Sequence, residues 1–180
     1  MPADLEIIDP ALKGKALTLI EKCKQRGAEM RANAGLRSPL EQARLWRQSR
    51  TTEAINQKIS LLRRAGADYL ATCIEKVGPQ FGKPVTNAIP GYSWHQWGQA
   101  LDFFWVVHGK AVWDTDLLID GVNGYQVLAE EATRLDLTPG GYWTSFKDWP
   151  HIQLPHEDNP DDVYTLAEIN AKMRERFGPI

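Results

Sequence analysis

Two histidines and two aspartates occupy positions that suit a metal-dependent hydrolytic site. His95 lies in the segment 92–103, and Asp102 follows it by seven positions, at the start of an apolar run. His151 begins a second short apolar segment, and Asp148 precedes it by three residues. Zinc binds neutral imidazole and carboxylate groups in tetrahedral geometry, and a catalytic zinc keeps its fourth position for water. We therefore expect His95, Asp102 and His151 to bind one zinc ion, with Asp148 as the acid/base.

Two of these ligands are expected near the starts of strands. Asp102 lies at the start of the run 101–107, which reads as a strand buried on both faces, and His151 begins the short strand 151–154. Pro150 precedes the second strand, and proline suits an edge position that needs no backbone donor. Because side chains alternate along a strand, two neighbouring strands could present Asp102 and His151 side by side.

Helix signals account for most of the remaining chain. Asp9 and Pro10 read as an N-cap with proline at the first helical position, and Ser38 and Thr165 each begin a capping box. Glycines follow several of the apolar helical stripes and mark their ends. The expected helices are 10–26, 39–50, 51–64, 67–77, 123–135 and one that begins at 166, and the further strands are 29–34 and 111–113.

The expected elements define a fold class. Strands and helices are mixed without a regular alternation, and the segments 79–90 and 155–162 are expected to be loops. We therefore expect an α+β fold, in which helices pack on a small, mainly antiparallel sheet that carries the metal ligands. The chain shows no internal repeat and no linker, so we expect one catalytic domain over residues 1–180.

Three motifs resemble those of one peptidase family. The pattern Ser-x-His-x-x-Gly-x-Ala-x-Asp at 93–102, followed by Asp-x-x-His at 148–151, resembles the zinc D-alanyl-D-alanine peptidase family. That family includes carboxypeptidases, dipeptidases and the L-alanyl-D-glutamate endopeptidases used as phage endolysins. Gly-Leu-Arg-Ser at 35–38 with Glu-Gln at 41–42 resembles the family's Gly-Tyr-Arg-Ser and the Glu-Gln that follows it. The resemblance implies the hedgehog/DD-peptidase fold, zinc as cofactor and peptidoglycan stem peptides as substrate.

The resemblance also implies roles for individual residues. Asp148 stands where better-known members often use Glu, and in this it resembles the endolysin-like branch. Arg37 would be a fixed cation for the scissile carbonyl or a substrate carboxylate, because its planar fork suits both. Ser93 would hydrogen-bond the peptide substrate. Tyr142 departs from the pattern, since endolysin-like members commonly have Asp in the corresponding Gly-Asp-Trp.

Composition limits the partners and the place of action. The chain has 180 residues, a net charge of −2 and a sequence pI of about 6.1, and no basic patch suggests nucleic acid. No apolar run reaches the length of a membrane span. The first residues lack the charged and apolar regions of a signal peptide, so we expect synthesis in the cytoplasm and holin-assisted release in a phage-infected host. We expect a monomer.

Several side chains that could do chemistry are expected to be structural or solvated. Cys23 and Cys73 lie among apolar residues in predicted helices, which favours buried free thiols. His108 in a predicted hairpin turn and His156 in a polar loop are expected to be solvated. The same expectation applies to the arginines of two predicted helices, which are Arg44, Arg47, Arg50, Arg63 and Arg64.

Four functions remain open at the level of sequence. The leading hypothesis is a zinc peptidase that cuts stem peptides between L-alanine and D-glutamate, and a D-alanyl-D-alanine carboxypeptidase is the close alternative. A non-haem iron oxygenase also uses two histidines and one carboxylate, but its usual pair is His-x-Asp on one strand. A zinc-bearing binding module without catalysis would have no need of Asp148 or Arg37.

Overall fold

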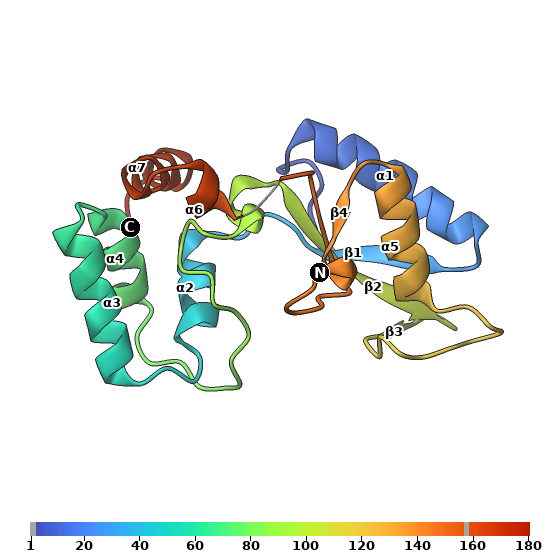
Figure 1. Ribbon diagram of the computed structural model, residues 1–180, viewed down its shortest axis with the longest axis horizontal. Helices are drawn as coiled ribbons and strands as arrows, with labels where there is room; N and C mark the ends of the chain where they lie inside the picture. Colours follow the sequence, from blue (N-terminus) through green and yellow to red (C-terminus); the bar gives the residue numbers. More distant parts are fainter. Residues whose placement is uncertain (1–2, 157–158) are drawn as a thin grey trace. The chain divides into compact units, whose positions relative to one another are not determined.

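The protein is described from a computed structural model, which defines residues 3–156 and 159–180 (Figure 1). The chain forms two compact units. The first takes its described residues from Met1–Leu36 and Trp97–Glu157, and the second from Arg37–Gln96 and Asp158–Ile180. The single catalytic domain expected over residues 1–180 stays a prediction, because a compact unit is not by itself a domain.

The first unit is built on an antiparallel sheet of five strands. The strands are β1 (Glu29–Ala34), β2 (Ala100–Val107), β3 (Lys110–Val112), β4 (Thr138–Pro139) and β5 (His151–Gln153). Their order is β1-β2-β5-β4, and β3 pairs with β2 beside this path. The strand β5 therefore lies between two neighbours, so the edge position expected for the strand after Pro150 is wrong. Pro150 itself still accepts a bond through its carbonyl, from the backbone N–H of Phe103 at 2.9 Å.

The two faces of β2 have different surroundings. Leu101, Phe103 and Trp105 are buried in the core, whereas Asp102 and Phe104 on the opposite face are half-buried. The second face is buried at Val106 but only partly buried at Asp102 and Phe104, so the prediction of a strand buried on both faces is wrong for these two residues. The face that carries Asp102 and Phe104 is called the open face of the sheet below.

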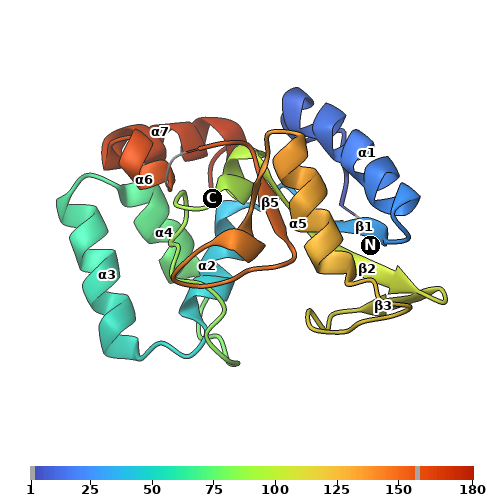
Figure 2. The ribbon, with the colours of Figure 1, turned by 45° about the vertical axis from the view of Figure 1, so that its right-hand side comes forward.

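Two helices cover the core face of this sheet. These are α1 (Pro10–Gln25) and α5 (Gly124–Arg134), which pack against each other and against the sheet (Figure 2). The Asp9 side chain accepts a bond from Ala11 N at the start of α1, as its cap sequence predicts. Cys23 in α1 is a buried free thiol, and burial raises its pKa to about 12.

The second unit is helical. Its helices are α2 (Pro39–Arg47), α3 (Thr52–Arg64), α4 (Asp68–Lys76), α6 (Pro160–Val163) and α7 (Leu166–Phe177). The capping boxes predicted at Ser38 and Thr165 are both present. Helix α4 has no side-chain cap of its own, and the Asn170 side chain of α7 accepts bonds from Tyr69 N at 3.1 Å and Leu70 N at 3.3 Å instead. The C-terminal helix is thus part of the unit's internal structure.

Arg47, the last residue of α2, and Arg50, three residues further on, are not solvated, contrary to expectation. The Arg47 guanidinium donates to the Ile74 carbonyl at 2.8 Å, and the Arg50 guanidinium donates to the Thr86 carbonyl at 3.0 Å. Burial lowers the pKa of both groups. Both arginines satisfy backbone carbonyls that the loop-like segment 79–90 and the end of α4 leave open.

The remaining departures from the predicted elements are local. Helix α2 ends at Arg47, three residues before the expected end. His108 is exposed as expected, but His156 is half-buried, and burial lowers its pKa. The expected polar loop 155–162 includes the first three of the four residues of α6, while its residues 157 and 158 lie outside the described residues. Within the described ranges, no helix has the length and apolar character needed to cross a membrane.

Candidate metal centre

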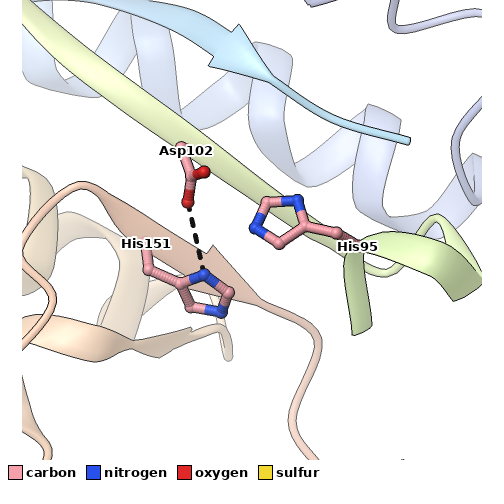
Figure 3. Close-up of side chains that lie close together, drawn as sticks. All are labelled: His95, Asp102 and His151. Carbon is pink, nitrogen blue, oxygen red and sulfur yellow. Dashed lines mark ion pairs between the residues drawn. The ribbon is translucent and has the colours of Figure 1, made fainter. Parts of the chain in front are cut away.

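Three side chains that lie far apart in the sequence meet at one end of the sheet. His95, Asp102 and His151 each offer one ligand atom, and these atoms all lie within 4.8 Å of one another (Figure 3). His95 and His151 are buried, and Asp102 is partly exposed. Figure 3 shows both imidazoles and the carboxylate converging on the same space. The structure therefore brings together the three residues that the sequence predicts as ligands.

The register between β2 and β5 positions two of the three candidate ligands. Asp102 of β2 lies directly opposite His151 of β5, so their side chains project from the same face. The distance between His151 Nδ1 and Asp102 Oδ1 is 3.3 Å. The sequence predicted this side-by-side placement from the apolar segments that the two residues begin.

The other nitrogen of His151 is held by a buried glutamine. Gln153 lies two positions along β5, on the same face, and its Oε1 is 2.9 Å from His151 Nε2. A carboxamide oxygen is an acceptor, so the imidazole donates Nε2–H to it. In the neutral ring, Nδ1 then carries a lone pair that faces the Asp102 carboxylate. Two acceptors at this distance repel each other unless a cation or a proton lies between them.

The pKa of His151 reflects this arrangement. Burial of the ring lowers the pKa, but hydrogen bonding to Asp102 and the negative charge of that carboxylate raise it more, and the net shift is upward. Gln153 and Asp148 add to the upward shift. A divalent metal ion can replace the proton that this environment favours, so metal and proton compete for the same position.

The backbone around His95 is fixed by a second buried glutamine. His95 belongs to the 3-10 helix η1 (Trp94–Trp97), and the neighbouring Gln96 is fully buried. Gln96 Oε1 accepts a bond from Gly91 N at 2.7 Å. Gly91 has a positive φ of 88°, and a Cβ there would lie 2.3 Å from Ile169 of α7. Only glycine fits this position, so α7 supports the segment that leads to His95.

Asp148 is held in a tight loop next to His151. Its backbone N–H donates to the Gly140 carbonyl at 3.0 Å, and its carbonyl accepts from His151 N at 3.1 Å. A Cβ on Gly140 would lie only 2.5 Å from the Asp148 carbonyl oxygen, so the loop closes this far because residue 140 is glycine. Trp143 from the same loop packs on His151, with ring centroids 4.9 Å apart.

Arg37 is oriented by a fully buried partner. Its Nη1 donates to Gln42 Oε1 at 3.0 Å, while Gln42 Nε2 donates to the Ala88 carbonyl at 2.8 Å. Gln42 is 0 % exposed, so its amide cannot reorient without breaking both bonds. The backbone N–H of Arg37 also donates to the His95 carbonyl at 3.2 Å. Ser93 lies two residues before His95 and is half-buried.

The donor set fits zinc. Two imidazoles and one carboxylate are ligands of catalytic zinc sites, which keep one position open for water or substrate. The ring nitrogen of His151 that faces away from Asp102 is held by an acceptor, Gln153 Oε1, as is usual for metal-bound imidazole. His151 Nδ1 and Asp102 Oδ1 lie 3.3 Å apart, and a cation bound to both would stabilise this close approach.

Comparison with known proteins decides the family. The family model described as "VanY: D-alanyl-D-alanine carboxypeptidase" matches residues 6–138. The chain belongs to the VanY family. As a VanY-family member with this ligand set, it is a zinc peptidase that hydrolyses peptidoglycan peptides.

Individual relatives of this VanY-family chain span most of its length. The peptidoglycan L-alanyl-D-glutamate endopeptidase CwlK of Bacillus subtilis is 28% identical over 157 residues, which cover 86% of this chain and 75% of CwlK. The L-Ala D-Glu endopeptidase ChiX of Serratia marcescens has a TM-score of 0.44 and 20% identity, covering 84% of this chain and 83% of that one. The D,D-pentapeptidase VanY of a VanB-type resistance cassette, solved with Zn(II), has a TM-score of 0.44 and 17% identity, covering 90% and 83%.

The sequence did not indicate the bonds that two glutamines make to side chains of the candidate site. Gln153 follows His151 by two positions, and strand alternation alone would have placed it on the ligand's face. Gln42 was noticed only as part of a motif, because its contact with Ala88 depends on tertiary structure. Each glutamine is bonded to one side chain of the candidate site, Gln153 to His151 and Gln42 to Arg37.

Proposed function

We propose that the protein is an endopeptidase that cuts peptidoglycan stem peptides between L-alanine and D-glutamate. The observation that carries this proposal is the match to CwlK, an L-alanyl-D-glutamate endopeptidase, over 86% of the chain. The motif resemblance to the endolysin-like branch, with Asp148 in the acid/base position, supports it. A D-alanyl-D-alanine carboxypeptidase is the second candidate, because the family model carries that description.

The site has the groups that peptide hydrolysis needs. Zinc held by His95, Asp102 and His151 would supply a Lewis acid and lower the pKa of coordinated water to about 7. In the proposed mechanism, an Asp148 carboxylate oxygen accepts the proton of the attacking water. The same oxygen then delivers the proton to the amide nitrogen of the leaving D-glutamate as the C–N bond breaks. The Gly140 contact fixes the loop from which Asp148 acts.

Arg37 and Ser93 complete the proposed site by binding substrate. The Arg37 guanidinium has one donor committed to Gln42, which fixes the plane of its fork. In the proposed mechanism the guanidinium binds the scissile carbonyl oxygen or a stem-peptide carboxylate. The Ser93 hydroxyl hydrogen-bonds the peptide backbone of the substrate.

The masses of the products test the proposed bond. Purified zinc-loaded protein is incubated with muropeptides that carry a pentapeptide stem, and the products are identified by mass spectrometry. Cleavage at the proposed bond separates the sugar with its L-alanine from a peptide that begins with D-glutamate. Release of terminal D-alanine would instead establish the carboxypeptidase reaction, and Asp148→Asn protein serves as the control for contaminating hydrolases.

Arg37→Lys is expected to behave almost like Arg37→Ala. An ammonium group cannot reproduce the fork that Gln42 orients, so we expect kcat/KM to fall by about 30- to 1,000-fold in both variants. Because Arg37 is not a zinc ligand, zinc content and Tm should remain close to wild type. The measurement is steady-state hydrolysis of a soluble muropeptide. Rescue of kcat/KM by lysine would show that a point charge suffices and would rule out the fork.

We propose that this activity serves as a phage-type endolysin, made in the cytoplasm and released with the help of a holin. The motif resemblance to that branch supports the role. Expression in a bacterial host together with a holin should then lyse the culture, and expression of either gene alone should not. Lysis that is independent of the holin would contradict the proposed route of release.

A further inference from the structure

An aromatic pair lies on the open face of the sheet, next to the metal ligands. Phe104 follows Asp102 by two positions in β2, so both side chains project from the same face. Trp113 directly follows β3 and packs on Phe104, with ring centroids 5.5 Å apart and an interplanar angle of 37°. Trp113 is nevertheless 52% exposed, so much of its indole surface is open to solvent.

Strand pairing places Trp113 and His151 along the same edge of β2. The strand β5 pairs with residues 100–102 of β2, and β3 pairs with residues 105–107 on that same side. His151 therefore lies opposite Asp102, while Trp113 packs at Phe104, two positions further along. Two residues of a strand span about 7 Å. Phe104, on which the indole packs, therefore lies about 7 Å along β2 from the ligand Asp102.

Charged groups border the aromatic pair on its other side. Arg31 of β1 lies directly opposite Phe104, and its guanidinium binds Glu29 with a closest distance of 2.6 Å. The two side chains are 57% and 51% exposed, so their remaining donors and acceptors face solvent. The open face thus offers an aromatic surface with fixed hydrogen-bonding groups beside it.

We infer that Phe104, Trp113, Arg31 and Glu29 form a saccharide subsite, which binds the glycan to which the stem peptide is attached. A pyranose ring has an apolar C–H face that packs on an aromatic ring, and a rim of hydroxyls that pair with charged groups. The substrate of this zinc peptidase is a peptide joined to such a glycan, so the occupant belongs to the same molecule as the scissile bond.

The inference rests on the proposed cleavage between L-alanine and D-glutamate. Between that bond and the sugar ring lie only L-alanine and the lactyl group, which together span about 7 Å when extended. This matches the spacing along β2 from Asp102 to Phe104. Cleavage between two D-alanines would place three further residues in between, about 10 Å more, and would carry the sugar past the subsite.

The test compares one peptide with and without its sugar. Zinc-loaded wild type and variants hydrolyse a disaccharide-linked stem peptide and the same peptide lacking the disaccharide. The quantity measured is the ratio of the two kcat/KM values. We expect wild type to prefer the sugar-bearing substrate, Trp113→Ala to lower that preference about tenfold, and Trp113→Phe to retain part of it. Because both kcat/KM values are measured on the same protein sample, their ratio does not depend on the fraction of that protein which is folded.

Controls separate the subsite from the proposed bond. Phe81 is 90% exposed and belongs to neither the ligand set nor the proposed subsite, so Phe81→Ala is the matched loss of an exposed aromatic ring and should keep the wild-type ratio. An equal ratio in wild type and Trp113→Ala would overturn the subsite, even where product masses place the cut after L-alanine. Product masses that show release of D-alanine would overturn the proposed bond itself, and the subsite with it.

Discussion

Alanine in place of His95, Asp102 or His151 is expected to remove most of the zinc and essentially all hydrolysis. Loss of an outer partner of a zinc ligand alone costs about 10- to 100-fold in metal affinity, so loss of a ligand should cost more than about 100-fold. Gln153→Ala should show the smaller, intermediate loss, because it removes only the acceptor that holds His151. Metal content after dialysis and competitive zinc titration measure the effect.

An exposed histidine provides the control for the metal experiment. His108 lies in the turn between β2 and β3 with a positive φ of 49°, a conformation that asparagine tolerates well. His108→Asn should therefore keep one zinc per chain and full activity. A ligand variant that still binds zinc as tightly as this control would remove that residue from the site.

Asp148→Ala is expected to separate binding from chemistry. The residue contacts Gly140 and His151 through its backbone, and these bonds survive the substitution. Removal of the carboxylate should then lower kcat by about 10²- to 10⁴-fold, as is typical for a general acid–base group, while zinc content stays at wild type. Single-turnover hydrolysis of a stem peptide and metal analysis of the same sample measure both effects.

An exposed aspartate that is not in the ligand set is the control for Asp148. Asp116 is exposed, and its backbone N–H is bonded to Asp114. Asp116→Asn should leave kcat unchanged. Wild-type turnover by Asp148→Ala would identify another group as the base, and loss of zinc in that variant would mean that Asp148 also supports the metal.

Local signals made the helices and the ligands predictable. Caps such as Asp9 and Ser38 act within one turn of the chain, so their sequence alone indicates where a helix begins. Asp102 and His151 each begin an apolar segment, and alternation then fixes their faces. These features depend on a few neighbouring residues and need no knowledge of the tertiary fold.

Features that depend on distant partners were not predictable. Arg47 and Arg50 look like surface residues of a helix, yet they bond to carbonyls of segments that come much later in the chain. Pro150 suits an edge strand, and only the two-residue strand β4, which is too short to recognise, makes β5 an interior strand. His156 has a polar sequence neighbourhood, whereas its burial comes from the folded unit.

The interrupted first unit has a consequence for folding kinetics. Ala34 of β1 pairs with Asp102 of β2, and the segment 37–96 between them belongs to the second unit. Closing such a long loop is slow, because its entropy is lost before the strand pairs form. The helices α2, α3 and α4 make contacts that are local by comparison and can form earlier. Since β5 supplies His151, a nascent chain that ends before this strand lacks the third ligand, and the hydrolase gains its metal site late in synthesis.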